Sequence, residues 1–341
     1  MAQDYAAFGA ALEQARVAGN TPALSAIILR DGAIAWEGYY GTSDDEGETR
    51  TDAQTTYSIA SVTKPIAATA IVAESLAAKL SLSASMSGDA GWTGTCEWLS
   101  TSQIAFGAGG KDAHGDTIPK MDCRRIPSIE DMLNMRANGP RFVYNPVSFA
   151  RIDRAIKGAG GRDLRAIVRE RVADPAGMRD TALGWRDPEG GAALRLLAPP
   201  FKRTKEGAEL STFGDDDFRA AAGIKTSARG IAAFDMAFDK GTLLPPRFIA
   251  DRIAGKPPGP RGDYRLGWFV QDWNGHRLLW HSGWEPDHYS AIYLKVPEKK
   301  LTLIVLANTD MLWWDNSLIR AEIENSPIVK RFLETFVEAP R

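Results

Sequence analysis

Ser61 is followed three positions later by Lys64 in the segment 57–65, YSIASVTKP. Residues at positions i and i+3 of a helix lie on one face, so the amine of Lys64 can lie beside the hydroxyl of Ser61. A serine hydroxyl needs an adjacent base to act as a nucleophile, and a neutral, desolvated lysine can be that base. Ser61 is the only serine of the chain with a lysine at this spacing. The pair is therefore a candidate nucleophile and base.

A helix must begin near this pair to position it. Pro65 fits the first turn of a helix, where no intrahelical acceptor is needed for its nitrogen. The positive end of the helix dipole would favour negative charge on Ser61. Residues 66–80 are rich in Ala, Ile, Val and Leu and contain no glycine, which predicts a largely buried helix.

Two further motifs carry residues suited to the same chemistry. Tyr144 stands in the segment 142–146, FVYNP, and the triplet 281–283 reads His-Ser-Gly. Each motif also has a purely structural interpretation. Ser61 and Lys64 fit a capping serine with a surface lysine, Tyr144 fits a packed aromatic, and His281 fits a strand histidine near the surface.

The expected elements place strands at both ends of the chain and helices between them. An Asp-Gly turn at 31–32 joins residues 24–29 and 33–40 as a β-hairpin. The other expected strands cover 264–273, 276–280, 289–296 and 301–307. The expected helices cover 4–18, 128–135, 149–157, 163–172, a segment capped by Thr226 or Ser227 that ends near 239, and 327–336 with Ser326 as its cap and Pro327 in first position. Segments 81–125 and 186–215 are expected to be irregular.

This order predicts an α+β fold. An antiparallel sheet formed from both chain ends is flanked by helices, and a mostly helical domain is inserted into it. We expect residues 1–60 and 212–341 to form the sheet domain and residues 61–211 the helical domain, with an active site between them.

The bulk composition excludes several classes of function. The chain has 341 residues, 44% of them hydrophobic and 25% charged, as is ordinary for a globular protein of about two domains. A net charge of −2 and the absence of basic runs argue against a nucleic-acid partner. No apolar stretch reaches the roughly 20 residues of a membrane span. The four histidines lack metal-ligand spacing, so neither a metal nor a cofactor is expected. The oligomeric state is not predicted.

The cysteines and the start of the chain bear on location. Cys96 and Cys123 lie in one expected loop, where they would close a disulfide in the periplasm or remain two free thiols in the cytosol. No signal peptide is visible, so Met1 fits either a cytosolic start or a mature chain with an added methionine. We favour an exported, periplasmic protein, because of the resemblance described next.

The motifs resemble those of the serine hydrolases of the class C β-lactamase type, which include D,D-peptidases, D-aminopeptidases and family VIII carboxylesterases. Three motifs match in order: Ser61-x-x-Lys64, Tyr144, and His-Ser-Gly at 281–283 in the place of Lys-Thr-Gly. The flanking segments 221–227 (AAGIKTS), 264–268 (YRLGW) and 306–308 (LAN) are similar to the family as well. The resemblance covers roughly residues 20–337.

The resemblance implies a mechanism and its residues. Ser61 attacks a carbonyl carbon, while Lys64 and Tyr144 share the proton transfers, and water then removes the acyl group from Ser61. The backbone N–H groups of Ser61 and Trp284 form the oxyanion hole. An adjacent ammonium would lower the pKa of Tyr144. His281, Gly283, Asn145 and Trp284 bind substrate, with Gly283 allowing the strand to approach it closely.

Two departures from the family pattern bear on the substrate. His281 stands where the family has a lysine, and a histidine is only partly charged near neutral pH, which favours neutral esters or amides. Pro146 stands where the family has an asparagine, so Asn145 would have to supply that amide. Trp284, Trp313 and Trp314 are candidates for an apolar acyl pocket, and segment 81–125 for a wall of the site.

We therefore expect a serine hydrolase that acts on a small-molecule ester or amide, first of all a carboxylesterase for small acyl esters. The alternatives are a D-aminopeptidase, a D,D-peptidase or a weak β-lactamase on the same site. A third hypothesis is a catalytically silent binding protein of the penicillin-recognition type.

Overall fold

The computed structural model describes residues 2–214 and 217–338. The remaining residues (1, 215–216 and 339–341) fall in the expected sheet domain and lie outside the described part.

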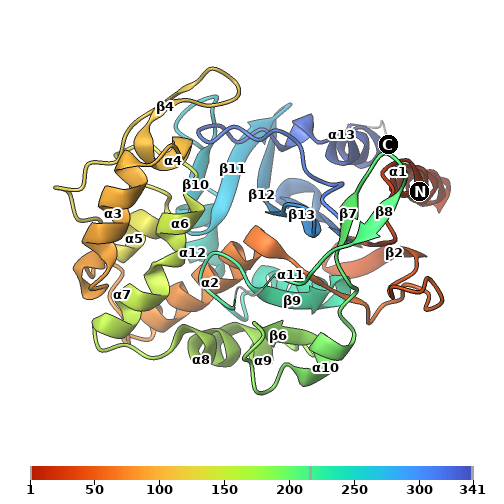
Figure 1. The fold of residues 1–341 in the computed structure, drawn as a ribbon, viewed down its shortest axis with the longest axis horizontal. Coiled ribbons are helices and arrows are strands. Elements are labelled where there is room, and N and C mark those ends of the chain that lie inside the picture. Colours follow the sequence, from red (N-terminus) through yellow and green to blue (C-terminus); the bar gives the residue numbers. More distant parts are fainter. Residues whose placement is uncertain (1, 215–216, 339–341) are drawn as a thin grey trace.

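A seven-stranded antiparallel sheet forms the centre of the fold (Figure 1). Its strands, in spatial order, are β10 (Asp263–Arg265), β11 (Trp268–Trp273), β12 (His276–Glu285), β13 (Tyr289–Val296), β14 (Leu301–Ala307), β1 (Ala23–Arg30) and β2 (Ala33–Gly41). Because β14 pairs with β1, the two ends of the chain meet in the middle of one sheet. The sheet built from both chain ends is thereby confirmed.

Helices cover both faces of the sheet. Side chains of one strand alternate between the faces, and Tyr293 and Glu37 point to the face where they bond Asp235 and Arg229 of α11 (Ala228–Asp239). The opposite face carries α1 (Ala2–Ala18), which packs on β2, and α13 (Pro327–Phe336), which packs on α1. Strands β1 and β14 are mostly apolar and buried along almost their whole length, because both of their faces are covered.

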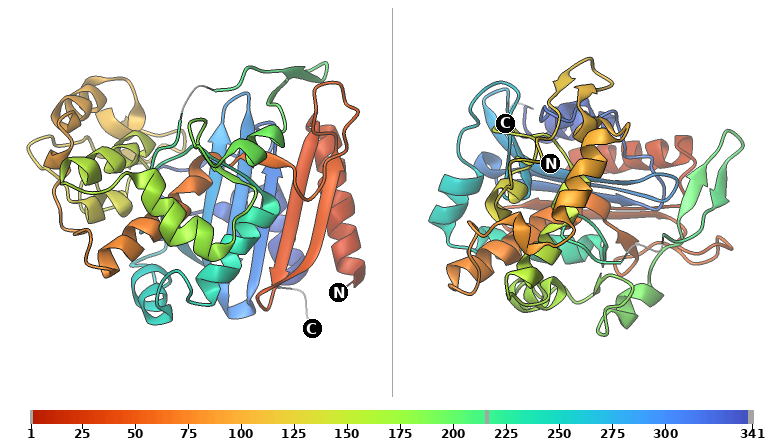
Figure 2. Two further views of the ribbon diagram at one scale, coloured as in Figure 1. Left: turned by 90° about the horizontal axis from the view of Figure 1, so that it is seen from below. Right: turned by 60° about the vertical axis from the view of Figure 1, so that its left-hand side comes forward.

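The segment between the two parts of the sheet is mostly helical and gathers on one side of it (Figure 2). Its helices are α2 (Thr63–Leu76), α3 (Trp92–Thr101), α4 (Ala105–Ala108), α5 (Ile129–Leu133), α6 (Pro146–Ala150), α7 (Ile152–Gly158), α8 (Leu164–Val168), α9 (Asp174–Ala176) and α10 (Gly191–Arg195); α12 (Pro246–Phe248) follows α11. In a three-stranded sheet, β9 (Ile224–Ser227) lies between β3 (Thr56–Ser58) and β6 (Thr181–Leu183). Two further pairs are β4 (Gly110–Lys111) with β5 (Thr117–Ile118) and β7 (Phe201–Arg203) with β8 (Ala208–Leu210).

The expected strand 264–273 is wrong as a single element. It is broken into β10 and β11 because Leu266 and Gly267 have φ values of +45° and +90° and reverse the chain. A Cβ on Gly267 would lie 2.7 Å from the Lys64 carbonyl oxygen, so this turn packs against the helix that carries the candidate base.

Segments 81–125 and 186–215 are more ordered than expected. The first contains α3 and α4 and is closed by a disulfide between Cys96 and Cys123, and the second contains α10 and the β7–β8 hairpin. Of the two candidate caps of α11, Ser227 is the one that accepts a hydrogen bond, from the Gly230 N–H. Ser326 stands at the start of α13 but its side chain makes no capping bond.

Candidate active site

Ser61 lies in a short 3-10 turn, η1 (Ala60–Val62), that leads directly into α2. The residue before it, Ala60, has a φ of +47°. This is a left-handed backbone conformation, which is energetically unfavourable for a residue that has a Cβ. This kink presents Ser61 at the entrance of α2, as the sequence predicts. The turn is held from the other side by β12, on which η1 packs.

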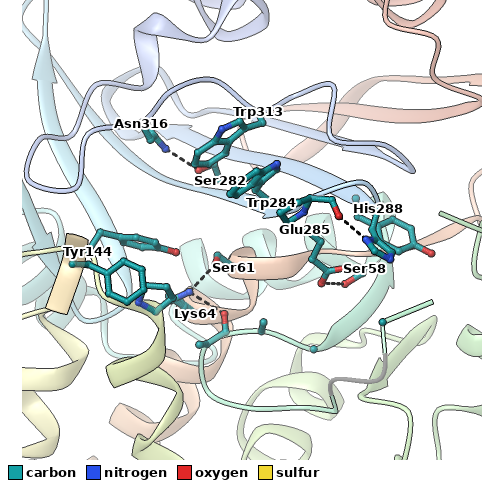
Figure 3. Close-up of a pocket in the computed structure, with 18 of the residues that line it drawn as sticks. Ser58, Ser61, Lys64, Tyr144, Ser282, Trp284, Glu285, His288, Trp313 and Asn316 are labelled. Atoms are coloured by element: carbon teal, nitrogen blue, oxygen red, sulfur yellow. Dashed lines mark hydrogen bonds between the residues drawn. The ribbon is translucent and has the colours of Figure 1, made fainter. Parts of the chain in front are cut away.

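Lys64, the second residue of α2, lies beside Ser61 (Figure 3). Its Nζ donates hydrogen bonds to Ser61 Oγ at 2.8 Å and to the Ala221 carbonyl oxygen at 3.0 Å. The lysine is fully buried, and this burial holds its pKa well below the usual value because the charged form loses its hydration. The amine form, which has a lone pair for a proton, is therefore favoured next to the Ser61 hydroxyl.

Tyr144 approaches the same pair from the segment before α6. The ring centre lies 5.1 Å from Lys64 Nζ, and the Tyr144 N–H donates to the Leu318 carbonyl oxygen at 2.7 Å. Burial raises the pKa of the phenol above its usual value, although its bond with Ser61 acts in the opposite direction. The expected lowering of this pKa by an ammonium is wrong for the free site, because burial dominates at both groups.

Strand β12 brings the third motif against the serine. A Cβ on Gly283 would lie 2.3 Å from the Ile59 carbonyl oxygen, so only glycine lets the two backbones come this close. The close approach is thus to the chain's own segment before Ser61. It brings Trp284, the next residue of β12, alongside η1, and both Ser61 and Trp284 line one cavity.

His281 is fully buried and does not line that cavity. Its Nδ1 lies 2.7 Å from the Ser282 carbonyl oxygen, which only accepts, so Nδ1 carries the proton. Nε2 then accepts from the Tyr264 hydroxyl at 3.0 Å. Burial, with Lys64 nearby, holds the pKa of His281 well below its usual value, so the ring is neutral. The structure therefore does not bring this residue to a position where it touches substrate.

Asn145 is likewise turned away from the cavity. Its Oδ1 accepts from the Ser148 N–H at 3.0 Å and so caps α6, while its Nδ2 donates to the Phe106 carbonyl oxygen at 3.3 Å. It does not supply the amide that the family pattern places near the lysine. The neighbouring Pro146 lines the cavity at that point.

The cavity has a volume of about 600 Å³ and is walled by aromatic side chains. Trp284 stacks on Trp313 with ring centres 4.5 Å apart, and both line the cavity as expected for an acyl pocket. Trp314 lies behind them, is nearly buried and does not line it. Phe106 brings one side chain of segment 81–125 into the wall.

Several polar residues of the cavity were not singled out from the sequence. Ser58 donates to Glu285 Oε1 at 2.7 Å, and Asn316 donates through Nδ2 to Ser282 Oγ at 3.2 Å (Figure 3). The buried Lys225 lies with its Nζ 4.5 Å from the Trp185 ring centre. Ser58 and Glu285 adjoin the first and third motifs, which is the signal that could have indicated them; Asn316 carries no such signal.

Two features bear on cofactors and membranes. Within residues 2–214 and 217–338, no three side chains of His, Cys, Asp or Glu are grouped so that they could hold a metal ion. The same part of the chain contains no helix with the length and apolar character needed to cross a bilayer.

Known proteins share this fold. A family model described as Beta-lactamase matches residues 9–316. Similar solved structures include EstCE1, a hydrolase with promiscuous acyltransferase activity (16% identity, TM-score 0.68, 98% of each chain covered). They also include a class C β-lactamase (15% identity, TM-score 0.69, 99% of this chain and 98% of that chain). A third is the D-amino acid amidase from Ochrobactrum anthropi SV3 (16% identity, TM-score 0.64, 98% of each chain). No curated protein sequence matches significantly.

The family match spans most of the chain, and the mixed fold and the structural relatives agree with it. The expected resemblance and fold class are thereby confirmed. The chain belongs to the Beta-lactamase family, a family of serine hydrolases.

Proposed function

We propose that this chain is a serine hydrolase that works through an acyl-enzyme on Ser61. The observation that carries the proposal is the 2.8 Å contact between Lys64 Nζ and Ser61 Oγ, made by a fully buried lysine whose pKa is lowered. A nucleophile within hydrogen-bond reach of a base whose neutral form is favoured by burial is the arrangement that covalent catalysis needs.

The opposite pKa shifts of Lys64 and Tyr144 support different roles for these two groups in proton transfer. Lys64, as the amine, takes the Ser61 proton while Oγ forms a bond to the substrate carbonyl carbon. Tyr144, whose raised pKa keeps the phenol protonated, gives its proton to the leaving oxygen as the carbon–oxygen bond breaks. Lys64 then returns a proton to Tyr144. In the second half, water attacks the acyl carbon and gives a proton to Lys64, which passes it to Ser61 Oγ as the bond between Oγ and the acyl carbon breaks.

The negative charge that develops on the carbonyl oxygen needs donors that are already in place. We assign this role to the backbone N–H groups of Ser61 and Trp284, which the close contact of Gly283 with Ile59 brings together. We also propose that the sheet part (1–60 and 212–341) and the helical part (61–211) act as two domains, because the cavity takes Ser61, Lys64 and Tyr144 from one and β12 from the other.

We further propose that the substrate is a small acyl ester, which makes the protein a carboxylesterase. The third motif supplies no positive charge, because His281 is buried and neutral, so this strand offers nothing to attract a substrate carboxylate. Pro146 and the paired rings of Trp284 and Trp313 leave an apolar wall for an acyl chain. One structural relative, EstCE1, is a hydrolase with acyltransferase activity.

The location that we propose is outside the cytosol. The disulfide between Cys96 and Cys123 supports it, because such bonds persist in oxidising compartments.

The first test compares hydrolysis of p-nitrophenyl butyrate by the natural sequence, by Ser61→Ala and by Ser75→Ala, a control at the far end of α2. We expect activity in the natural sequence and the control and its loss in Ser61→Ala. Activity only on D-alanine p-nitroanilide would indicate a D-aminopeptidase instead of an esterase, and activity only on nitrocefin would indicate a β-lactamase. A stable adduct on Ser61 without turnover would make the chain a binding protein.

A further inference from the structure

A second cavity lies on the other side of the segment that carries Tyr144. It has a volume of about 930 Å³, lies beside the edge strand β10, and shares no lining residue with the catalytic cavity. The two cavities are separated by the chain around Tyr144 and Leu318, because Val143 and Ile319 face the second cavity. The proposed hydrolysis makes no use of it.

The lining of this second cavity is strongly basic. It contains four arginines and one aspartate, which amounts to three net positive charges in a chain whose total charge is −2. The arginines are Arg136, Arg141, Arg261 and Arg265. A concentration of one sign of charge in a concave site raises the local concentration of ions of the opposite sign.

The single aspartate, Asp263, is hydrogen-bonded to two of these arginines. Its carboxylate accepts from Arg136 Nη2 at 3.1 Å and from Arg265 Nε at 2.9 Å. Arg265 is held further by the Gly255 and Lys256 carbonyl oxygens at 2.7 and 2.8 Å. These two guanidinium groups are therefore fixed in place by the protein, with one carboxylate between them.

Arg141 and Arg261 differ from that pair. Within residues 2–214 and 217–338 neither side chain makes a hydrogen bond or an ion pair, and both are exposed. Another acid near Arg261 is Asp116, which is bonded to Arg320 at 2.6 Å. Two guanidinium groups with five N–H donors each are thus available to a ligand at the rim of the cavity.

The frame around these arginines is stiff and partly apolar. Four of its lining residues are prolines, Pro119, Pro140, Pro258 and Pro260, and their fixed φ angles limit rearrangement of the rim. Phe142, Val143 and Ile319 offer apolar surface next to the charges. The volume is that of a site for a small organic molecule rather than for a single inorganic ion.

We propose that this second cavity binds a small organic anion with at least two oxyanion groups, phosphate or carboxylate. Arg141 and Arg261 contact the oxyanions, because a guanidinium binds two oxygens of one phosphate or carboxylate in its own plane. The Arg136–Asp263–Arg265 cluster holds the floor and contributes positive potential.

The test is isothermal titration of the full chain at low and physiological ionic strength. Fructose 1,6-bisphosphate is the phosphate probe, tricarballylate the carboxylate probe, and fructose the neutral control. The double variant Arg141→Gln/Arg261→Gln is compared with Arg50→Gln/Arg195→Gln, which removes the same charge from exposed arginines that line neither cavity. The thermal midpoint of each variant is measured to confirm folding.

We expect one of the two anions to bind, and its Kd to rise about tenfold or more in the cavity variant and less than about twofold in the control. Tighter binding of the bisphosphate identifies a phosphorylated ligand, and tighter binding of tricarballylate a polycarboxylate. The proposal is overturned if neither anion binds, if fructose binds equally well, or if both double variants weaken binding to the same extent.

Discussion

The contact between Gly283 and Ile59 offers the sharpest test of how the oxyanion site is built. In Gly283→Ala the new Cβ would lie 2.3 Å from a carbonyl oxygen and 3.1 Å from the Ala60 Cβ, about 1 Å short of ordinary contact with the oxygen. The clashing oxygen belongs to the backbone and the Ala60 Cβ has no torsion by which it could move away, so no side chain can turn aside. Strand β12 and the turn η1 must therefore separate by roughly that distance, and with them the N–H groups of Trp284 and Ser61. A misplacement of about 1 Å costs on the order of a hundredfold in rate.

The assay is the steady-state hydrolysis of p-nitrophenyl butyrate, with thermal unfolding measured in parallel. We expect kcat to fall about a hundredfold in Gly283→Ala with a smaller change in KM, and a loss of about 1–3 kcal/mol in unfolding free energy from the forced contact. The control is Gly94→Ala in α3, where a Cβ meets nothing within 4 Å and activity should stay unchanged. A folded Gly283→Ala protein with the natural kcat would refute this account of the oxyanion site.

Three further predictions concern other ionisable and covalent features. Because burial holds the pKa of Lys64 well below its usual value, kcat/KM should fall as the pH drops through that lowered pKa. The side chain in Lys64→Arg is always charged, so kcat/KM of this variant should be lower by about 10²-fold or more at every pH. An active Lys64→Arg protein would show that Lys64 is not the base. Burial raises the pKa of Asp153 to about 6, above its unfolded value of about 3.8, so the folded state binds this proton more tightly and unfolding free energy is lost as the pH rises from about 4 to 6. Asp153→Asn should therefore stabilise by about 1–3 kcal/mol at pH 7.5 and by little at pH 4, as measured by urea unfolding, and an equal effect at both pH values would contradict this. Replacing Cys96 and Cys123, 27 positions apart, by serine should cost about 3 kcal/mol of unfolding free energy, and an unchanged urea midpoint would show that the bond adds no stability.

The sequence predicted best those features that depend on local pattern. Residues 289–296 and 301–307 are apolar runs that end at turn residues, and both are strands with these bounds. The spacing of Ser61 and Lys64 fixes their contact because it needs only one helical turn.

The features that the sequence could not predict depend on contacts between distant segments. The break between β10 and β11 arises where Gly267 packs against the Lys64 carbonyl oxygen, and nothing within 264–273 signals that neighbour. His281 was expected to meet substrate, yet Tyr264 takes its Nε2 and both faces of β12 are covered. A strand pattern shows alternation but not what lies on each face.

The electrostatics of the site were missed for a related reason. The resemblance places Lys64 next to Tyr144 in the site, and this suggests that an ammonium lowers the pKa of the phenol. Burial reverses that expectation, because the cost of desolvation pushes Lys64 towards its amine and Tyr144 towards its phenol. The extent of burial depends on the packing of the whole fold, and a short motif does not predict it.

The meeting of both chain ends in one sheet has a consequence for biosynthesis. Strand β14, which ends at Ala307, lies between β13 and β1, so β1 lacks its second strand partner until the residues through Ala307 have left the ribosome. During that interval the apolar β1 is an open strand that other nascent chains can pair with. In the finished protein α1 and α13 lie side by side, with Tyr5 and Phe336 stacked 5.1 Å apart (Figure 1). A short linker between α1 and α13, with a new opening in an exposed turn, would let the hairpin and its partner strands be translated one after another.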